Sequence, residues 1–201
     1  MNADTVQSVL APFLVALSVA FVWPQVVRSF RSVAGLSLAS MAQNVWASGL
    51  WVLYGVRTTT PPLVFANASA GIGFALVLVA ATRAEVVSTR TMMFHTAGLL
   101  ALVPVALTIP ATALGWAAIV VGATGILPQV ARTLAATDHT GVSRPTYAMV
   151  VALTTSWSVY GILERDLLIV LPNFVILPSA LLVLWHTHPR RNTAVAHAAA
   201  N

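Results

Sequence analysis

The stretch FVWPQVVRSF, residues 21–30, returns later in the chain as GILPQVARTL, residues 125–134. In both stretches a Pro-Gln pair and an arginine stand at the same positions near the end of an apolar segment. The identical residues are Pro24, Gln25, Val26 and Arg28 in the first stretch and Pro128, Gln129, Val130 and Arg132 in the second. Apolar helices often share Leu, Ala and Val, but a shared Pro-Gln pair is much rarer. The two stretches therefore indicate an internal duplication.

The similarity continues beyond these stretches toward the C-terminus. Three further groups match in the same order, which are Gly-Leu-Ser (35–37) with Gly-Val-Ser (141–143), Trp-x-x-Tyr-Gly (51–55) with the same pattern at 157–161, and Asn67 with Asn173. Each asparagine stands twelve residues beyond the glycine of its own pattern. Rare residue types at a fixed spacing predict two copies of one unit, not two unrelated apolar regions.

The composition places these units in a membrane. Hydrophobic residues make up 58% of the chain and charged residues only 7%. A soluble domain has about a quarter of its residues charged. Crossing about 30 Å of hydrocarbon takes roughly 20 apolar residues in a helix. The 201 residues therefore predict an all-α integral membrane protein.

Seven apolar segments are long enough to be transmembrane helices, and they lie at 6–28, 36–56, 61–82, 92–109, 111–132, 144–163 and 167–186. We expect four parts, namely a first triple-helix repeat (1–83), a linker helix (84–110), a second triple-helix repeat (111–187) and a disordered cytoplasmic tail (188–201). Because the second copy begins after four helices, both copies have the same orientation. The prediction is a 3+1+3 parallel repeat of triple-helix bundles, an arrangement that places a binding site at the repeat interface.

The arginines predict how this array is oriented. Eight of them fall on one side of the predicted spans, Arg28, Arg31, Arg83, Arg90, Arg132, Arg144, Arg190 and Arg191, against Arg57 and Arg165 on the other. Because short cytoplasmic loops carry an excess of positive charge, we expect the N-terminus outside and the C-terminus in the cytoplasm. The five acidic residues all fall in loops or ends. We expect a multi-pass protein of the plasma membrane.

These motifs resemble those of a known family. The paired Pro-Gln motifs within a 3+1+3 plan resemble the PQ-loop superfamily. Within it, the Trp-x-x-Tyr-Gly pattern and the following asparagine are similar to those of SWEET and SemiSWEET sugar transporters, over about residues 6–186. The resemblance implies uniport of mono- or disaccharides by alternating access. It also implies a substrate cavity lined by Trp51, Trp157, Asn67 and Asn173.

The chemistry of these four side chains suits a sugar, although each has a structural alternative. An asparagine amide offers one acceptor and two donors to hydroxyl groups, but Asn67 and Asn173 could instead join helices to each other. Indole rings can stack on the C–H face of a sugar, but Trp51 and Trp157 could instead belong to an interfacial aromatic belt. We favour the substrate-binding role for both the asparagine pair and the tryptophan pair.

A second group of residues is expected to move or close the cavity. Pro24 and Pro128 kink their helices, because proline removes a backbone hydrogen bond. Gln25 and Gln129 either cap the carbonyls freed there or close a cytoplasmic gate. The remaining hinge or gate candidates are Pro145, Tyr54 and Tyr160, with Ala39 in place of the first-copy proline.

Other classes of protein fit the sequence less well. The chain has no lysine for a retinal Schiff base and no cysteine for a thiolate site. It has no basic stripe with interleaved aromatic residues for nucleic acid. Since no nucleophile–base constellation is present, we expect neither an enzyme nor a cofactor, and a metal site at His186 and His188 is disfavoured. Transport of another small neutral solute such as an amino acid, a receptor or trafficking role on the same fold, and a homo-oligomer stay open.

Overall fold

The computed structural model of the chain describes residues 3–163, 165 and 167–188. These residues form helices and connecting loops, and none of them forms a strand. The helices are α1 (Ala3–Ala20), α2 (Trp23–Ser29), α3 (Leu38–Arg57), α4 (Pro61–Arg83), α5 (Thr89–Thr108), α6 (Ala111–Thr124), α7 (Leu127–Ala135), α8 (Arg144–Leu163), α9 (Leu167–Val170) and α10 (Asn173–His186). Apart from His188, the predicted tail lies outside the described residues, as do Glu164 and Asp166.

Six segments of the described chain are long and apolar enough to cross a membrane, Pro12–Ser29, Leu63–Arg83, Thr89–Thr108, Ala111–Ala135, Arg144–Leu163 and Leu167–His186. They agree with the predicted multi-pass helical membrane protein. The remaining predicted segment, α3, has the necessary length of 20 residues, but its polar side chains lower its hydropathy. Two of them bond inside the protein, since Gln43 donates to the Val121 carbonyl at 3.1 Å and Asn44 to the Ser40 carbonyl at 2.8 Å.

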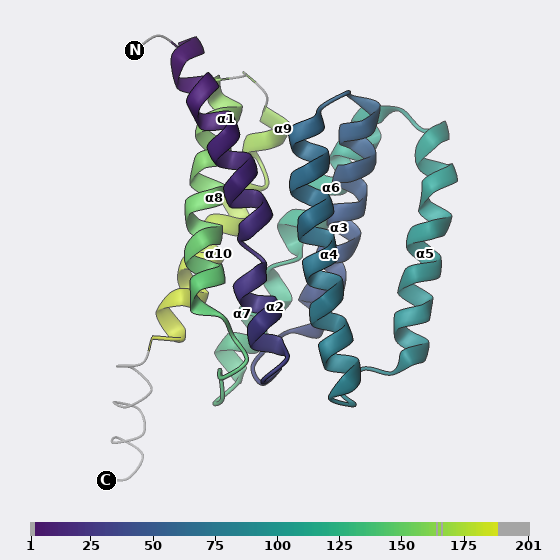
Figure 1. The fold of residues 1–201 in the computed structure, drawn as a ribbon, viewed down its shortest axis with the longest axis vertical. Coiled ribbons are helices and arrows are strands. Elements are labelled where there is room, and N and C mark those ends of the chain that lie inside the picture. Colours follow the sequence, from purple (N-terminus) through teal and green to yellow (C-terminus); the bar gives the residue numbers. More distant parts are fainter. Residues whose placement is uncertain (1–2, 164, 166, 189–201) are drawn as a thin grey trace.

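Among the described helices, α1, α4, α3, α6, α10 and α8 pack in that order, and α8 returns to α1 to close a ring. Exchanging α1 with α6, α4 with α10 and α3 with α8 maps this order onto itself. The short helices follow the same rule, because α2 packs on α4 and α8 while α7 packs on α10 and α3. Figure 1 shows the ring helices running between the same two ends of the molecule.

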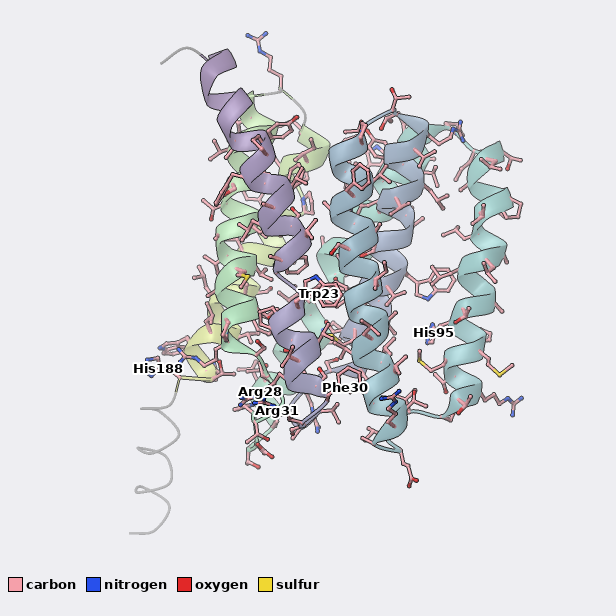
Figure 2. All side chains as sticks on the ribbon, viewed as in Figure 1. Trp23, Arg28, Phe30, Arg31, His95 and His188 are labelled. Atoms are coloured by element: carbon pink, nitrogen blue, oxygen red, sulfur yellow. The ribbon has the colours of Figure 1, made fainter. Side chains whose placement is uncertain are left out.

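The helix α5 lies outside this ring and packs against α3. Trp46 Nε1 on α3 donates a 3.0 Å hydrogen bond to His95 Nδ1 on α5. Farther along, a guanidinium nitrogen of Arg57 donates to the Ala106 carbonyl at 2.7 Å. His95 points from α5 toward the ring (Figure 2), so the linker helix is held by polar contacts on one face.

Two ring helices are interrupted next to the Pro-Gln pairs. The helix α1 ends at Ala20, and α2 begins two residues before Gln25. In the same way α6 ends at Thr124, and α7 begins two residues before Gln129. Because proline cannot bond the carbonyl four residues earlier, the carbonyls of Ala20 and Thr124 lose their usual partners. The kinks predicted at Pro24 and Pro128 are therefore breaks between two helices in the structure.

A third break was not predicted. The apolar segment 167–186 is divided into α9 and α10 by Leu171 and Pro172. The predicted segment is confirmed as long and apolar enough to cross a membrane, but it is interrupted inside, since Pro172 has no N–H for the carbonyl four residues earlier. At the matching position α4 has Ala66 and continues unbroken.

Candidate functional site

The ring encloses a cavity of about 220 Å³ that touches all six of its helices. On α3 the lining residues are Ser40, Met41, Asn44, Ala47, Ser48 and Trp51, and on α8 they are Thr146, Tyr147, Val150, Leu153, Thr154 and Trp157. Each residue of the first set has its counterpart 106 positions later, as Trp51 and Trp157 illustrate. Within each set the positions recur at spacings of three, four and seven residues, so each helix presents one face to the cavity.

The asparagines line the cavity from a second matched pair of segments. Leu63, Ala66, Asn67 and Ala70 on α4 have Ile169, Pro172, Asn173 and Ile176 as counterparts in the α9–α10 region. Thus the four predicted substrate-binding residues, Trp51, Trp157, Asn67 and Asn173, all line one cavity.

Each of these asparagines is anchored by its own helix. Asn67 Nδ2 donates to the Leu63 carbonyl at 2.9 Å, and Asn173 Nδ2 donates to the Ile169 carbonyl at 3.0 Å. The second bond spans the break between α9 and α10. A fixed amide keeps one N–H and its oxygen for a ligand and loses little entropy on binding. Both bonds join residues four apart in the sequence, so neither amide joins two different spans through them.

The tryptophans have matched packing but different polar partners. Trp51 stands edge-on to Tyr54 and Trp157 to Tyr160, both with ring centroids 5.6 Å apart. Trp157 Nε1 donates to Ser18 Oγ at 3.2 Å. Gly122 occupies the matching position near Trp51, where an added Cβ would lie 3.6 Å from Trp51 Nε1.

The cavity lining is largely apolar, but it carries polar groups as well. Its hydroxyl and amide side chains come from Ser18, Gln25, Ser40, Asn44, Ser48, Asn67, Thr146, Tyr147, Thr154 and Asn173. None of its lining residues among those described is acidic, basic or a histidine. Burying a charge without a partner is far more costly than burying a hydroxyl that finds hydrogen bonds. The cavity therefore suits a neutral ligand that presents both apolar surface and hydrogen-bonding groups.

Asn44 is a lining residue that sequence reasoning missed. It has Val150 as its counterpart, so no matched pair of polar residues marks it in the sequence. The spacing to Trp51 was an available signal, because residues seven apart lie on the same face of a helix. Asn44 gives the first half of the ring an amide that the second half lacks.

The two glutamines of the Pro-Gln pairs bond the loops of the opposite half. Gln25 Nε2 donates to the Gly141 carbonyl at 2.9 Å, and Gln129 Nε2 donates to the Gly35 carbonyl at 3.0 Å. Both side chains are fully buried. Their hydrogen bonds therefore do not cap the carbonyls freed at the kinks, which was one of the two roles expected for these glutamines.

The two loops that receive these bonds also touch each other. Gly141 N–H donates to the Ala34 carbonyl at 2.9 Å. An added Cβ on Gly141 would lie 2.5 Å from that carbonyl oxygen, and one on Gly35 would lie 2.5 Å from the Asp138 carbonyl oxygen. Gly35 also has a φ of +75°, which favours glycine. This contact closes the end of the ring that carries Arg28, which we call the arginine end.

The other hinge or gate candidates lie away from the cavity lining. Tyr54 and Tyr160 pack behind the tryptophans, and Pro128 lines neither the cavity nor the outer cleft described below. Pro24 and Pro145 line that cleft. Pro145 is the second residue of α8, where a missing N–H has little cost.

No protein-family model matches this chain, and no curated protein matches it. Within residues 3–163, 165 and 167–188, no three His, Cys, Asp or Glu side chains lie together as a metal site would require.

Proposed function

We propose that the chain is a facilitative transporter that moves mono- or disaccharides across a membrane by alternating access. One observation carries the proposal. An uncharged cavity with amide and hydroxyl groups among its apolar lining lies between two sets of helices with matched residues, and hydrogen bonds between the two sets close one end. A ligand can be held in the middle of such a bundle while the closure breaks and re-forms.

The architecture that supports this function is the 3+1+3 parallel repeat. In it α1 to α4 form one unit, α6 to α10 form the other, and α5 is the linker. The ring order and the paired cavity residues support this division. Here α3 is the seventh span, whose polar face is turned to the cavity and to α6. A parallel repeat of this kind holds its substrate at the interface of the units.

The cavity favours a sugar over an amino acid. The amides of Asn44, Asn67 and Asn173 offer both donors and acceptors to hydroxyl groups, and the two indole rings offer apolar faces. A zwitterionic amino acid brings two charges that need partners once they leave water. The lining provides no charged side chain.

The same absence of charge in the lining supports uniport. A proton-coupled carrier needs a titratable group along its membrane path. The acidic residues of the sequence lie in loops or ends, and the described cavity lining contains no acid or histidine. Transport therefore follows the gradient of the substrate alone.

The size of the cavity bears on the substrate. About 220 Å³ falls below the roughly 300–1,000 Å³ of typical ligand pockets. A monosaccharide fits this conformation better than a disaccharide. The breaks at 21–22 and 125–126 are joints at which α2 and α7 swing to open the arginine end. This end faces the cytoplasm of a plasma-membrane protein, in keeping with its arginines.

Equilibrium binding tests the proposal. Purified protein is titrated with monosaccharides, disaccharides and neutral amino acids, alongside the Trp157→Ala variant and a Trp116→Ala control on the exposed face of α6. We expect saturable binding of a sugar that Trp157→Ala abolishes and Trp116→Ala leaves unchanged. Binding confined to amino acids, or equal sugar binding by all three proteins, would contradict the proposal.

A further inference from the structure

A second cavity, which we call the basic cleft, opens at the arginine end between α2, α8 and the loop 136–143. Its volume is about 1140 Å³. Three arginines line it, which are Arg28, Arg31 and Arg144, against one carboxylate, Asp138. Figure 2 shows Arg28 and Arg31 close together at the end of α2. Arg144 comes from the start of α8, so residues far apart in the sequence converge here.

The carboxylate in the basic cleft is already engaged. Asp138 Oδ1 accepts a 2.8 Å hydrogen bond from the Thr140 backbone N–H. This bond, with a second one from the Thr140 side chain, lowers the pKa of Asp138. Asp138 thus serves to shape its own loop, and it forms no ion pair that would neutralise an arginine of the cleft among the described residues.

Two nitrogens at the basic cleft are buried without a hydrogen-bond partner among the described residues, Arg144 Nε and His139 Nδ1. The exposed Arg28 differs from them, because its Nε donates to the Thr140 carbonyl, which fixes the Arg28 guanidinium against the loop. Buried N–H groups of this kind almost always find an acceptor. An anionic oxygen in the cleft would supply one for Arg144, and guanidinium groups bind phosphate oxygens in a two-bond geometry.

One part of the basic cleft is apolar. Ala20, Trp23 and Val27 line it, and all three precede Arg28 and Arg31 in the sequence. All three are exposed on the outer surface of the ring, and Trp23 precedes the arginines along α2. Such a cleft is charged at its end and apolar along its wall. That combination matches a lipid, with its headgroup at the arginines and its acyl chain along α2.

Two arginines of the basic cleft have no counterpart in the other copy. In the alignment of the two copies, Ala135 stands opposite Arg31 and Leu38 stands opposite Arg144. Arg28 does have a counterpart, Arg132, but Arg132 does not line the cleft. The duplicated fold therefore does not itself require Arg31 or Arg144.

We propose that the basic cleft binds the phosphate group of an anionic membrane lipid. The site is separate from the substrate cavity, and it is built from both halves of the ring. A free phosphate ion shares the headgroup chemistry, but it makes no use of the apolar wall formed by Trp23 and Val27.

The test is titration of the purified protein in neutral detergent with three probes, dioctanoyl-phosphatidylglycerol, dioctanoyl-phosphatidylcholine and inorganic phosphate. We expect saturable binding of phosphatidylglycerol only, weakened about 5-fold in Arg31→Gln and about 30-fold in Arg31→Gln with Arg144→Gln. The matched control, Arg132→Gln, should bind like the unchanged protein. Arg31→Lys with Arg144→Lys should recover only part of the loss, since it restores both charges but not the two-bond geometry of the guanidinium groups.

Three outcomes would overturn the proposal. Equal affinity of the Arg31→Gln and Arg132→Gln variants for phosphatidylglycerol would show that binding depends on the overall charge of the protein and not on this cleft. Equal binding of phosphatidylcholine would remove the role of the negative charge. Inorganic phosphate binding as tightly as phosphatidylglycerol would assign the cleft to the free ion. The Arg31 variant keeps the test valid if the double variant fails to fold, because Arg31 is exposed.

Discussion

Gln25 Oε1 accepts a 2.8 Å hydrogen bond from the backbone N–H of Ser143, which lies 118 residues further along the chain. Gln129 Oε1 accepts the matching 2.8 Å bond from the N–H of Ser37. Both serines also cap the helix that follows, since Ser37 Oγ accepts from the Ser40 N–H and Ser143 Oγ from the Thr146 N–H. The closure of the arginine end is thus reciprocal and is tied directly to the starts of α3 and α8.

Replacing Gln25 with alanine should loosen this closure. The change leaves the Ser143 N–H and the Gly141 carbonyl without partners in a buried place, at a cost of about 1–3 kcal/mol, or roughly 5- to 150-fold in the closed population. Because the chain has no cysteine, Ser48→Cys places a single thiol in the cavity lining. Its rate of labelling by an impermeant maleimide from the arginine end measures the opening.

The matched control for this experiment is Thr82→Ala, which removes a hydrogen bond within α4 only. Labelling should rise in Gln25→Ala and in Gln129→Ala, and it should stay unchanged in Thr82→Ala. Labelling that is unchanged in both glutamine variants would show that these bonds do not form the closure.

Removing either cavity asparagine should weaken substrate binding without unfolding the protein. Asn67→Ala and Asn173→Ala each strand ligand hydroxyls in a desolvated pocket, which lowers affinity roughly 5- to 150-fold. We expect the Asn173 change to be the more severe, because Asn173 is buried and stands between Pro172 and Pro178. Equilibrium sugar binding and the melting temperature are measured on the same samples. A lowered melting temperature with normal binding in both variants would mean that the asparagines serve packing alone.

Trp51 offers a more selective test, because its indole N–H lacks the serine partner that Trp157 has. Gly122→Ser introduces a hydroxyl near Trp51 Nε1, as Ser18 provides for Trp157. If that N–H binds substrate, the new internal bond should lower affinity about 2- to 10-fold. Gly122→Ala is the matched control, since it adds the Cβ without the acceptor. Equal affinities of the two variants would exclude a role for this N–H.

The orientation of the spans can be tested with reporter fusions. Fusions after Arg31, Arg83 and Arg191 should report the cytoplasm, and a fusion after Arg57 should report the outside. The comparison of Arg31 with Arg57 decides whether α3 crosses the membrane. An external signal after Arg83 would reverse the parity on which the parallel repeat depends.

The sequence predicted those features of the molecule that are marked by matching residues in both copies. Proline, glutamine, tryptophan and asparagine at equal spacings located the helix breaks at 21–22 and 125–126 and the residues that share the cavity. Asn44 and Ser18 have apolar or glycine counterparts, Val150 and Gly122, so no repeat marked them.

Other features depend on tertiary packing and leave no local signal. Pro172 breaks its helix, yet Pro104 lies within the uninterrupted α5. A proline removes one bond in either case, and the surrounding helices decide whether the chain separates there. The meeting of Arg31 with Arg144 likewise depends on α1 packing against α8. Taken singly, each arginine indicates only which side of the membrane its loop occupies.

The most direct test of the proposed function is entry of labelled neutral sugars into liposomes that contain the purified protein. Unchanged protein, Asn173→Ala protein and empty liposomes are compared, each with and without a proton gradient. We predict that a monosaccharide enters at a saturable rate until its concentration is equal on both sides of the membrane. The proton gradient should not change this rate, and Asn173→Ala should lower it. Entry no faster than into empty liposomes for every sugar, or accumulation driven by the proton gradient, would contradict the account.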